Sequence, residues 1–256
     1  MHQRQRPHPG LHQQPHHPRA DVPGRRRHHD PHDCVLPRPA RPNTPATTVA
    51  GVFVAVLGVA PGVGKSTLCA GLAAALPGRR VDHFREEEIL SRPAFAAVAA
   101  EFRTGPVRLE TLLEATAAFV AGSAGVDVVI ADALLPYLPS LRAWGHPTPV
   151  IQSFLTALAA VVSPVVLFLD GDPVAALERA VAREGPDWAD WFVAKLAGYP
   201  GSGVRDLATA AAYLAGERDL TLRLLAGWNV HVLPEGPPEA VLAAALRALP
   251  PLGSLP

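Results

Sequence analysis

A glycine-rich segment, residues 58–67, contains the residue types that bind phosphate groups: Gly58-Val-Ala-Pro-Gly-Val-Gly-Lys-Ser-Thr67. Gly62 and Gly64 allow the backbone to bend so that its N–H groups face inward, where they can surround phosphate oxygens. Lys65 can reach the β- and γ-phosphates of ATP, and the Ser66 hydroxyl can bind Mg²⁺. The residues expected to hold ATP are Gly58, Pro61, Gly62, Val63, Gly64, Lys65, Ser66 and Thr67.

Four further charged residues are candidates for catalysis. Asp82 and Asp132 lie close to the ends of apolar runs, where a carboxylate can accept a proton or bind Mg²⁺. Arg179 and Arg183 are four residues apart and share one helical face, from which they can neutralise the charge of a phosphoryl group. Structural roles are the alternative: the aspartates can cap the turns that follow them, and the arginines can pair with neighbouring glutamates on the surface.

Apolar runs alternate with helical patterns from residue 52 to residue 249. The runs are short and uniformly apolar, as in VFVAVL at 52–57, which is typical of strands buried on both faces. Strands are expected at 52–57, in a short segment that ends at 80–81, and at 126–131, 165–169 and 229–233. Helices are expected at 66–76, 93–103, 107–121, 149–162, 173–184, 186–196, 205–226 and 238–249. This alternation predicts an α/β domain with a parallel sheet and helices on both of its faces.

The glycine-rich segment lies between a predicted buried strand and a predicted helix, which is the setting of a P-loop. Over residues 52–249 the chain resembles the P-loop kinases of small molecules, of the uridine-kinase-like type. Asp82-His-Phe-Arg85 is similar to the Asp-x-Phe segment of those enzymes, and residues 169–183 are similar to the segment that leads into their lid. The resemblance implies a three-layer P-loop NTPase fold whose five strands, numbered along the chain, are ordered 2-3-1-4-5.

The resemblance also implies a reaction, the transfer of the γ-phosphoryl group of ATP to a hydroxyl group of a small molecule. In that reaction Asp82 would accept the proton, and Asp132 would join Ser66 at the Mg²⁺ ion or contact the substrate; the reverse division of these roles between the two aspartates stays open. The two arginines would close over the phosphates, and residues 185–203 would form a lid. The residues with an implied catalytic role are Lys65, Asp82, Asp132, Arg179 and Arg183.

The loop departs from the commonest pattern because it is one residue longer, so that Val59 stands where the first glycine is usual, as in dethiobiotin synthetases. No arginine-rich lid signature is present. The chain also lacks the Asn-Lys-x-Asp of Ras-like GTPases and the Leu-Ser-Gly-Gly-Gln of ABC ATPases. Two alternatives to a kinase stay open: an ATPase or nucleotide switch that regulates a protein partner, and an ATP-binding module without turnover.

Charge divides the chain into a basic tail and an acidic body. Residues 1–49 hold 8 Arg and 3 Asp, a balance of +5, together with 8 of the 11 His and 10 of the 28 Pro. This tail has too few apolar side chains for a core and is expected to be disordered, although a translation start near residue 49 or 52 would also explain the boundary. Residues 50–256 carry a balance of −5 and are expected to form the kinase-like domain, without a nucleic-acid partner.

Other features point to a soluble cytoplasmic protein whose partner is a small-molecule acceptor. The uncharged stretch at 143–169 is interrupted by prolines, which argues against a membrane span. Two cysteines cannot form a disulfide framework, and no secretion signal is apparent. Neither the acceptor nor the oligomeric state can be inferred from the sequence.

Metal binding outside the loop is not expected. The three histidines of the body are scattered along it, which argues against a zinc site, and Cys69 is expected to be a small buried apolar residue. Lysine is rare, since only two of the 23 basic residues are lysines. Lys65 therefore stands out as a position that needs a compact positive charge.

Overall fold

The computed structural model describes residues 51–132 and 135–251, so the basic tail and the prediction of its disorder lie outside the described residues. Within these ranges five parallel strands form one sheet in the order β2-β3-β1-β4-β5, which confirms the order expected from the sequence. The strands are β1 (Val52–Leu57), β2 (Val81–Phe84), β3 (Val128–Asp132), β4 (Val165–Asp170) and β5 (Val230–Pro234).

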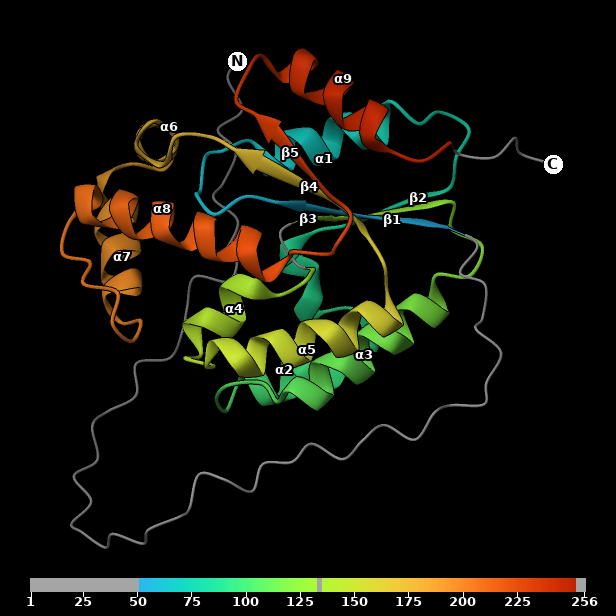
Figure 1. Ribbon diagram of the computed structural model, residues 1–256, viewed down its shortest axis with the longest axis horizontal. Helices are drawn as coiled ribbons and strands as arrows, with labels where there is room; N and C mark the ends of the chain where they lie inside the picture. Colours follow the sequence, from blue (N-terminus) through green and yellow to red (C-terminus); the bar gives the residue numbers. More distant parts are fainter. Residues whose placement is uncertain (1–50, 133–134, 252–256) are drawn as a thin grey trace, which may run out of the picture. The chain divides into compact units, whose positions relative to one another are not determined.

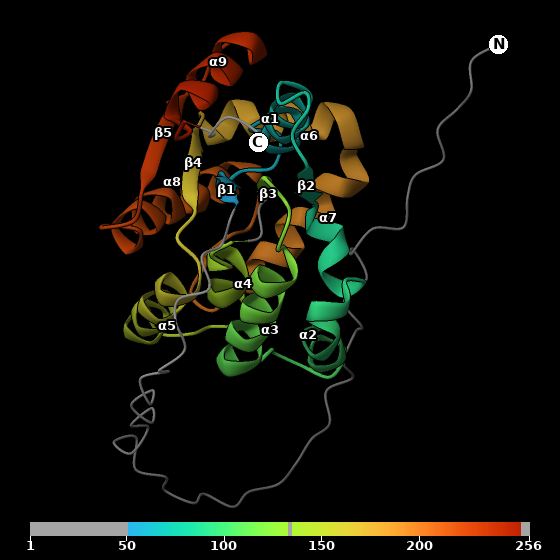
Figure 2. The same cartoon turned by 90° about the vertical axis from the view of Figure 1, so that its right-hand side faces the viewer.

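Helices cover both faces of the sheet, as Figure 1 and the turned view in Figure 2 show. α1 and α9 lie on one face, and α2, α3 and α5 lie on the other. The helices are α1 (Lys65–Ala74), α2 (Ala96–Phe102), α3 (Leu109–Gly122), α4 (Leu138–Ala143), α5 (Thr148–Val161), α6 (Pro173–Glu184), α7 (Pro186–Ala197), α8 (Leu207–Leu224) and α9 (Pro238–Ala248). None of the helices between residues 51 and 251 that the structure describes is both long and apolar enough to cross a membrane.

Two apolar cores flank the sheet because successive strand residues point to opposite faces. On the α1 face, Val54 and Val56 of β1 pack in one cluster with Leu68 and Leu72 of α1. On the other face the core is rich in aromatic rings; Phe84 of β2, for example, lies 4.8 Å from a ring of α3, measured between centroids. The same alternation decides which polar side chains meet at the ends of the strands.

A third group of helices, α6, α7 and α8, lies beyond the end of the sheet to which the strands point (Figure 1). These helices share a core of their own that includes Leu177, Phe192 and Leu214. Trp188 stacks on Phe192, with ring centroids 5.0 Å apart and an angle of 8° between the planes. The group places α6 and α7 at the carboxyl edge of the sheet, where the phosphate loop begins.

The second strand lies later in the chain than expected. The sequence indicated a strand around residues 80–81, whereas β2 extends from Val81, which pairs with Val128, to Phe84. Asp82 is therefore inside the strand and not beyond it. The first acidic residue that follows β2 is Glu86, at the start of a short 3₁₀ helix, η1 (Glu86–Leu90).

Candidate functional site

The glycine-rich loop joins β1 to the N-terminus of α1. Gly62 and Gly64 both have left-handed backbone conformations, with φ of 79° and 99°, which glycine adopts without a steric penalty. Gly64 is the N-cap of α1, so the N–H groups that follow it have no acceptor within the helix. A Cβ atom placed on Gly64 would meet no atom within 4 Å. The loop thus offers free donors beside open space, which is the geometry of an anion site at a helix N-terminus.

α6 packs closely on this loop. A Cβ atom on Gly62 would lie 2.2 Å from the carbonyl oxygen of Ala176 in α6. Arg179 of the same helix donates a hydrogen bond from Nε to the carbonyl oxygen of Gly62 (3.1 Å) and forms an ion pair with Glu235 (2.7 Å). Glu235 also accepts a hydrogen bond from the backbone N–H of Asp172 (3.2 Å). Arg179 therefore links the loop, its own helix and the segment after β5.

Arg183 lies one turn further along α6. Its Nε pairs with the neighbouring Glu184 at 2.7 Å, on the exposed side of the helix. Its positive charge also contributes to lowering the pKa of Lys65. Both predicted arginines are thus present at the loop, but each is already paired with a glutamate.

Lys65 remains close to its own loop. Its Nζ donates a hydrogen bond to the carbonyl oxygen of Ala60, at 3.1 Å. Burial lowers the pKa of Lys65, while the negative charges of Glu86 and Asp132 act in the opposite direction. Two carboxylates therefore accompany the lysine at the phosphate loop.

Glu86 is a site residue that the sequence analysis missed. Among the acidic groups it acts most strongly on Lys65, followed by Asp132. The surrounding protein raises the pKa of Glu86 by removing part of its hydration, whereas Lys65 and Lys195 lower it. Its side chain is nevertheless exposed. Glu86 is thus a carboxylate that protein surrounds on several sides but that solvent and substrates can reach.

Lys195 is the second lysine of the chain and the second missed residue. It lies in the last turn of α7, is exposed, and places its Nζ 5.1 Å from the centroid of the Trp191 ring. The surrounding protein lowers the pKa of Lys195, and the charge of Glu86 raises it. Both lysines therefore act on the same carboxylate, and the rarity of lysine, which drew attention to Lys65, would have singled out Lys195 as well.

Asp132 lies where the sequence analysis expected an acid. It is the last residue of β3, level with Val56 of β1, and is only 7% exposed. The hydroxyl of Ser66, in the first turn of α1, and the carboxylate of Asp132 are hard oxygen donors, the ligand type that Mg²⁺ prefers. This donor set fits the metal that the loop motif implies.

Asp82 occupies a different place from the one expected, because β2 includes it. It pairs with Val129 of β3, which pairs with Phe53 of β1. Phe53 precedes the last residue of β1 by four positions, roughly 13 Å at the rise of a strand. Asp82 is therefore near the opposite end of the sheet from the phosphate loop.

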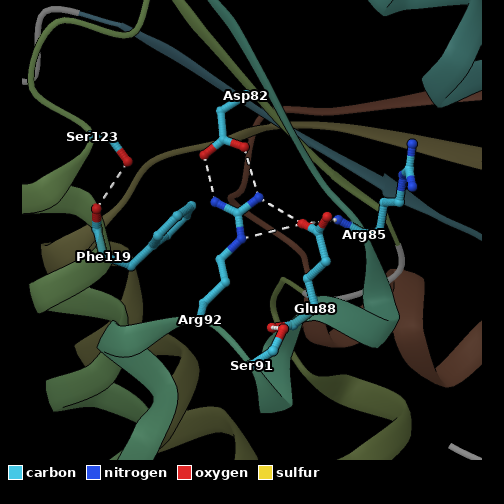
Figure 3. Close-up of polar contacts among 7 residues, drawn as sticks. All are labelled: Asp82, Arg85, Glu88, Ser91, Arg92, Phe119 and Ser123. Atoms are coloured by element: carbon cyan, nitrogen blue, oxygen red, sulfur yellow. Dashed lines mark hydrogen bonds and ion pairs between the residues drawn. The ribbon is translucent and has the colours of Figure 1, made fainter. Parts of the chain in front are cut away.

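Asp82 is held there by Arg92, as Figure 3 shows. Both of its carboxylate oxygens accept hydrogen bonds from the guanidinium group, at 2.6 and 2.7 Å. Arg92 also pairs with Glu88 at 2.7 Å, and its guanidinium carbon lies 4.4 Å from the centroid of the Phe84 ring. The geometry gives Asp82 a structural partner and does not bring it to Lys65.

The loop geometry and the strand order together define the class of fold. A glycine-rich loop follows the central strand β1 and opens α1, in a parallel sheet of order β2-β3-β1-β4-β5. This is the α/β fold of P-loop nucleotide-binding proteins.

Comparison with known proteins gives a likeness in structure only. No family model and no curated protein matches the chain. Among solved structures 127 chains match. One of them is deoxyadenosine kinase from M. mycoides, solved with the product dCMP and a flexible dCDP bound; it is 13% identical, the match covers 77% of this chain and 97% of that chain, and the TM-score is 0.44. At this identity and score the comparison assigns neither a reaction nor a substrate to this chain.

Proposed function

We propose that this chain is an ATP-dependent phosphotransferase that moves the γ-phosphoryl group of ATP to a hydroxyl group of a small molecule. The observation that carries the proposal is an exposed carboxylate beside the phosphate loop: Glu86 is the first acidic residue after β2, and its negative charge raises the pKa of Lys65. A loop that only binds phosphate does not need such a group. Transfer to a hydroxyl does, because the hydroxyl must lose its proton.

The loop residues supply the binding of the phosphates. Free N–H groups at the start of α1 donate to phosphate oxygens, which the positive end of the helix also attracts. Lys65 exchanges its hydrogen bond with the carbonyl oxygen of Ala60 for one with a charged phosphate oxygen, which is the stronger acceptor. Ser66 and Asp132 are the residues that would hold Mg²⁺, which when bound neutralises charge on the β- and γ-phosphates.

Glu86 accepts the proton in the transfer step. The acceptor oxygen bonds to the γ-phosphorus as its proton passes to Glu86, while the bond from the γ-phosphorus to the bridging oxygen breaks and ADP leaves with that electron pair. The raised pKa of Glu86 makes it a stronger base than an ordinary carboxylate. The charge of Lys195 opposes this increase.

The two arginines of α6 have separate roles in this proposal. Arg183, whose charge is felt at Lys65, neutralises charge on the transferring phosphoryl group. Arg179 holds the loop in its binding conformation through the carbonyl oxygen of Gly62. α7 begins directly after α6, and with Lys195 it forms the part of the predicted lid, residues 185–203, that reaches Glu86.

Nucleotide binding is tested by isothermal titration of the full chain with ATP and ADP in the presence of Mg²⁺. Lys65→Ala should weaken ATP binding roughly 10-fold or more, because a charge-assisted contact to phosphate is lost. Arg247→Ala removes an exposed positive charge from α9 and serves as the matched control. Equal affinity in wild type and Lys65→Ala would contradict the phosphate site.

The reaction is tested with ATP labelled at the γ-phosphate and pools of hydroxyl compounds: nucleosides, sugars, vitamins and aminoglycosides. A labelled small molecule, absent with Lys65→Ala, supports the phosphotransferase. Release of inorganic phosphate that only a protein partner stimulates would support a nucleotide switch instead. ATP binding without any turnover, across pools and partners, would support a binding module.

A further inference from the structure

Three potential metal ligands from separate elements converge beneath the phosphate loop. They are Cys69 of α1, His83 of β2 and Asp132 at the end of β3, and their ligand atoms all lie within 4.8 Å of one another. Cys69 is fully buried and Asp132 is 7% exposed, whereas His83 is partly buried. This cluster is not visible in the sequence, because the histidines of the body are scattered along the chain.

The convergence follows from the backbone and does not depend on one side-chain rotamer. His83 pairs with Ile130 of β3, so the two side chains point to the same face of the sheet. Asp132 is two residues beyond Ile130 and points to that face as well. α1 covers this face, and Cys69 packs there in one apolar cluster with Ile130. The register of β2 and β3 therefore brings the three groups together.

An independent observation marks the cluster as incomplete. The Nε2 atom of His83 is buried and has no hydrogen-bond partner. Buried polar atoms almost always have a partner, and an unpaired one costs about 1–3 kcal/mol. A metal ion bound to the lone pair of this nitrogen would give the atom the partner that it lacks.

We propose that Cys69, His83 and Asp132 bind a transition-metal ion of the Zn²⁺ class. Sulfur, imidazole nitrogen and one carboxylate oxygen form a mixed ligand set that Zn²⁺ accepts and that Mg²⁺ and Ca²⁺, which take oxygen ligands, do not. Three protein ligands leave a fourth position for water. The site shares Asp132 with the proposed phosphotransfer site, whereas Cys69 and His83 have no role in that reaction.

Binding requires the thiol of Cys69 to lose its proton. The metal–sulfur bond forms with the electron pair of the S–H bond, a water leaves the metal, and one proton passes to solvent. Affinity for the metal should accordingly fall as the pH decreases.

Cobalt(II) is the probe, because a thiolate ligand gives it an intense charge-transfer absorption in the near ultraviolet. The full chain contains one other cysteine, Cys34, and eight histidines before residue 50, so titrations use wild type, Cys34→Ser and Cys69→Ser. We expect one thiolate-bound equivalent in wild type and Cys34→Ser, its displacement by Zn²⁺, and loss of the absorption in Cys69→Ser. No charge-transfer band, or a band that disappears with Cys34→Ser and survives in Cys69→Ser, would overturn the proposal.

A second pair of variants keeps the test valid if Cys69→Ser does not fold. His146 also has a buried Nε2 atom without a partner but is not part of the cluster, which makes it a matched control for His83. In the Cys34→Ser background, His83→Gln should weaken cobalt binding at least about 10-fold, and His146→Gln should not change it. Equal affinities in these two variants would show that His83 is not a ligand.

Discussion

Asp82 and Glu86 are carboxylates only four residues apart, but the structure predicts different roles for them. Asp82 is expected to stabilise the fold, and Glu86 is expected to be the general base. Glu86 follows β2, is exposed and interacts with Lys65 and Lys195, whereas Asp82 lies within β2 and is held at both oxygens by Arg92. Glu86→Gln and Asp82→Asn are nearly isosteric and each removes one negative charge. We expect the first to lower the rate of phosphotransfer strongly without loss of stability, and the second to lower stability without loss of phosphotransfer.

The magnitudes follow from the contacts. Removal of a general base typically lowers kcat by about 10²- to 10⁴-fold, and a substitution at an exposed position changes the free energy of unfolding by less than about 0.5 kcal/mol. Asp82→Asn loses the charge of a bidentate pair whose partners are each about one-quarter exposed, with side-chain values of 23% for Arg92 and 24% for Asp82. The asparagine can still accept one hydrogen bond, and Arg92 retains Glu88, so we estimate a loss of about 1–2 kcal/mol. For a domain of this size that corresponds to a decrease in Tm of roughly 2–8 °C.

The assay measures both quantities on both variants. Thermal unfolding is followed by circular dichroism, and kcat is measured with labelled ATP and the acceptor that the screen identifies. If Asp82→Asn lost activity while Glu86→Gln retained it, the base would be Asp82, as the sequence first indicated, and the roles derived from the register of β2 would be refuted. A stability loss in Glu86→Gln equal to that of Asp82→Asn would also contradict these roles, because an exposed carboxylate should not contribute that much.

Three other predictions concern the loop, the base and an ion pair. Gly62→Ala should destabilise the fold by about 2 kcal/mol or more in urea unfolding, because an alanine there would combine a left-handed φ with a Cβ atom 2.2 Å from the backbone of α6. The control is Gly64→Ala, which also has a left-handed φ but no atom within 4 Å of the added Cβ, and it should cost only about 1–2 kcal/mol. Lys195→Met should shift the acid limb of the pH profile of kcat/KM to higher pH, because the lysine lowers the pKa of Glu86. An unchanged profile would show that Lys195 does not affect the group that titrates there. The pKa of Asp170 is lowered by hydrogen bonds from Arg218, so this pair contributes stability above the unfolded pKa of about 3.9 that disappears as the pH falls below it. Arg218→Met should therefore flatten the pH dependence of urea unfolding in this acid range, and a curve parallel to wild type would argue against the assignment.

Most of the fold could be predicted from the sequence because apolar periodicity decides it. The run at 52–57 matches β1 in full, and the proline at residue 173 correctly marks the start of α6. β2 was the exception. It is an edge strand with Asp82 and His83 in its interior, so it lacks the uniformly apolar pattern of the central strands. Its true bounds differ by only a few residues, but that difference moves Asp82 from the carboxyl edge of the sheet to a position near the opposite end.

The site was less predictable than the fold because it combines groups distant in sequence. Glu86 stands among three consecutive glutamates, and nothing in the sequence distinguishes it from its neighbours. Only the register of β2 brings it to Lys65. Lys195 comes from α7, whose position depends on the packing of α6, α7 and α8 around their own core. Local sequence patterns cannot specify where Glu86 and Lys195 lie in the fold, although the rarity of lysine could have drawn attention to Lys195.

Asp132 connects the two proposed sites, and this connection has a thermodynamic consequence. It would help to hold Mg²⁺ with Ser66 on one side and a Zn²⁺-class ion with Cys69 and His83 on the other. If one ion changes the affinity for the other by some factor, linkage requires the reverse effect to be equal. Because Asp132 is a ligand in both proposed sites, Asp132→Asn should weaken the binding of both MgATP and cobalt. Lys65→Ala should weaken only nucleotide binding, and Cys69→Ser should weaken only cobalt binding. An Asp132→Asn chain that lost one ligand and retained the other at wild-type affinity would assign the carboxylate to a single site.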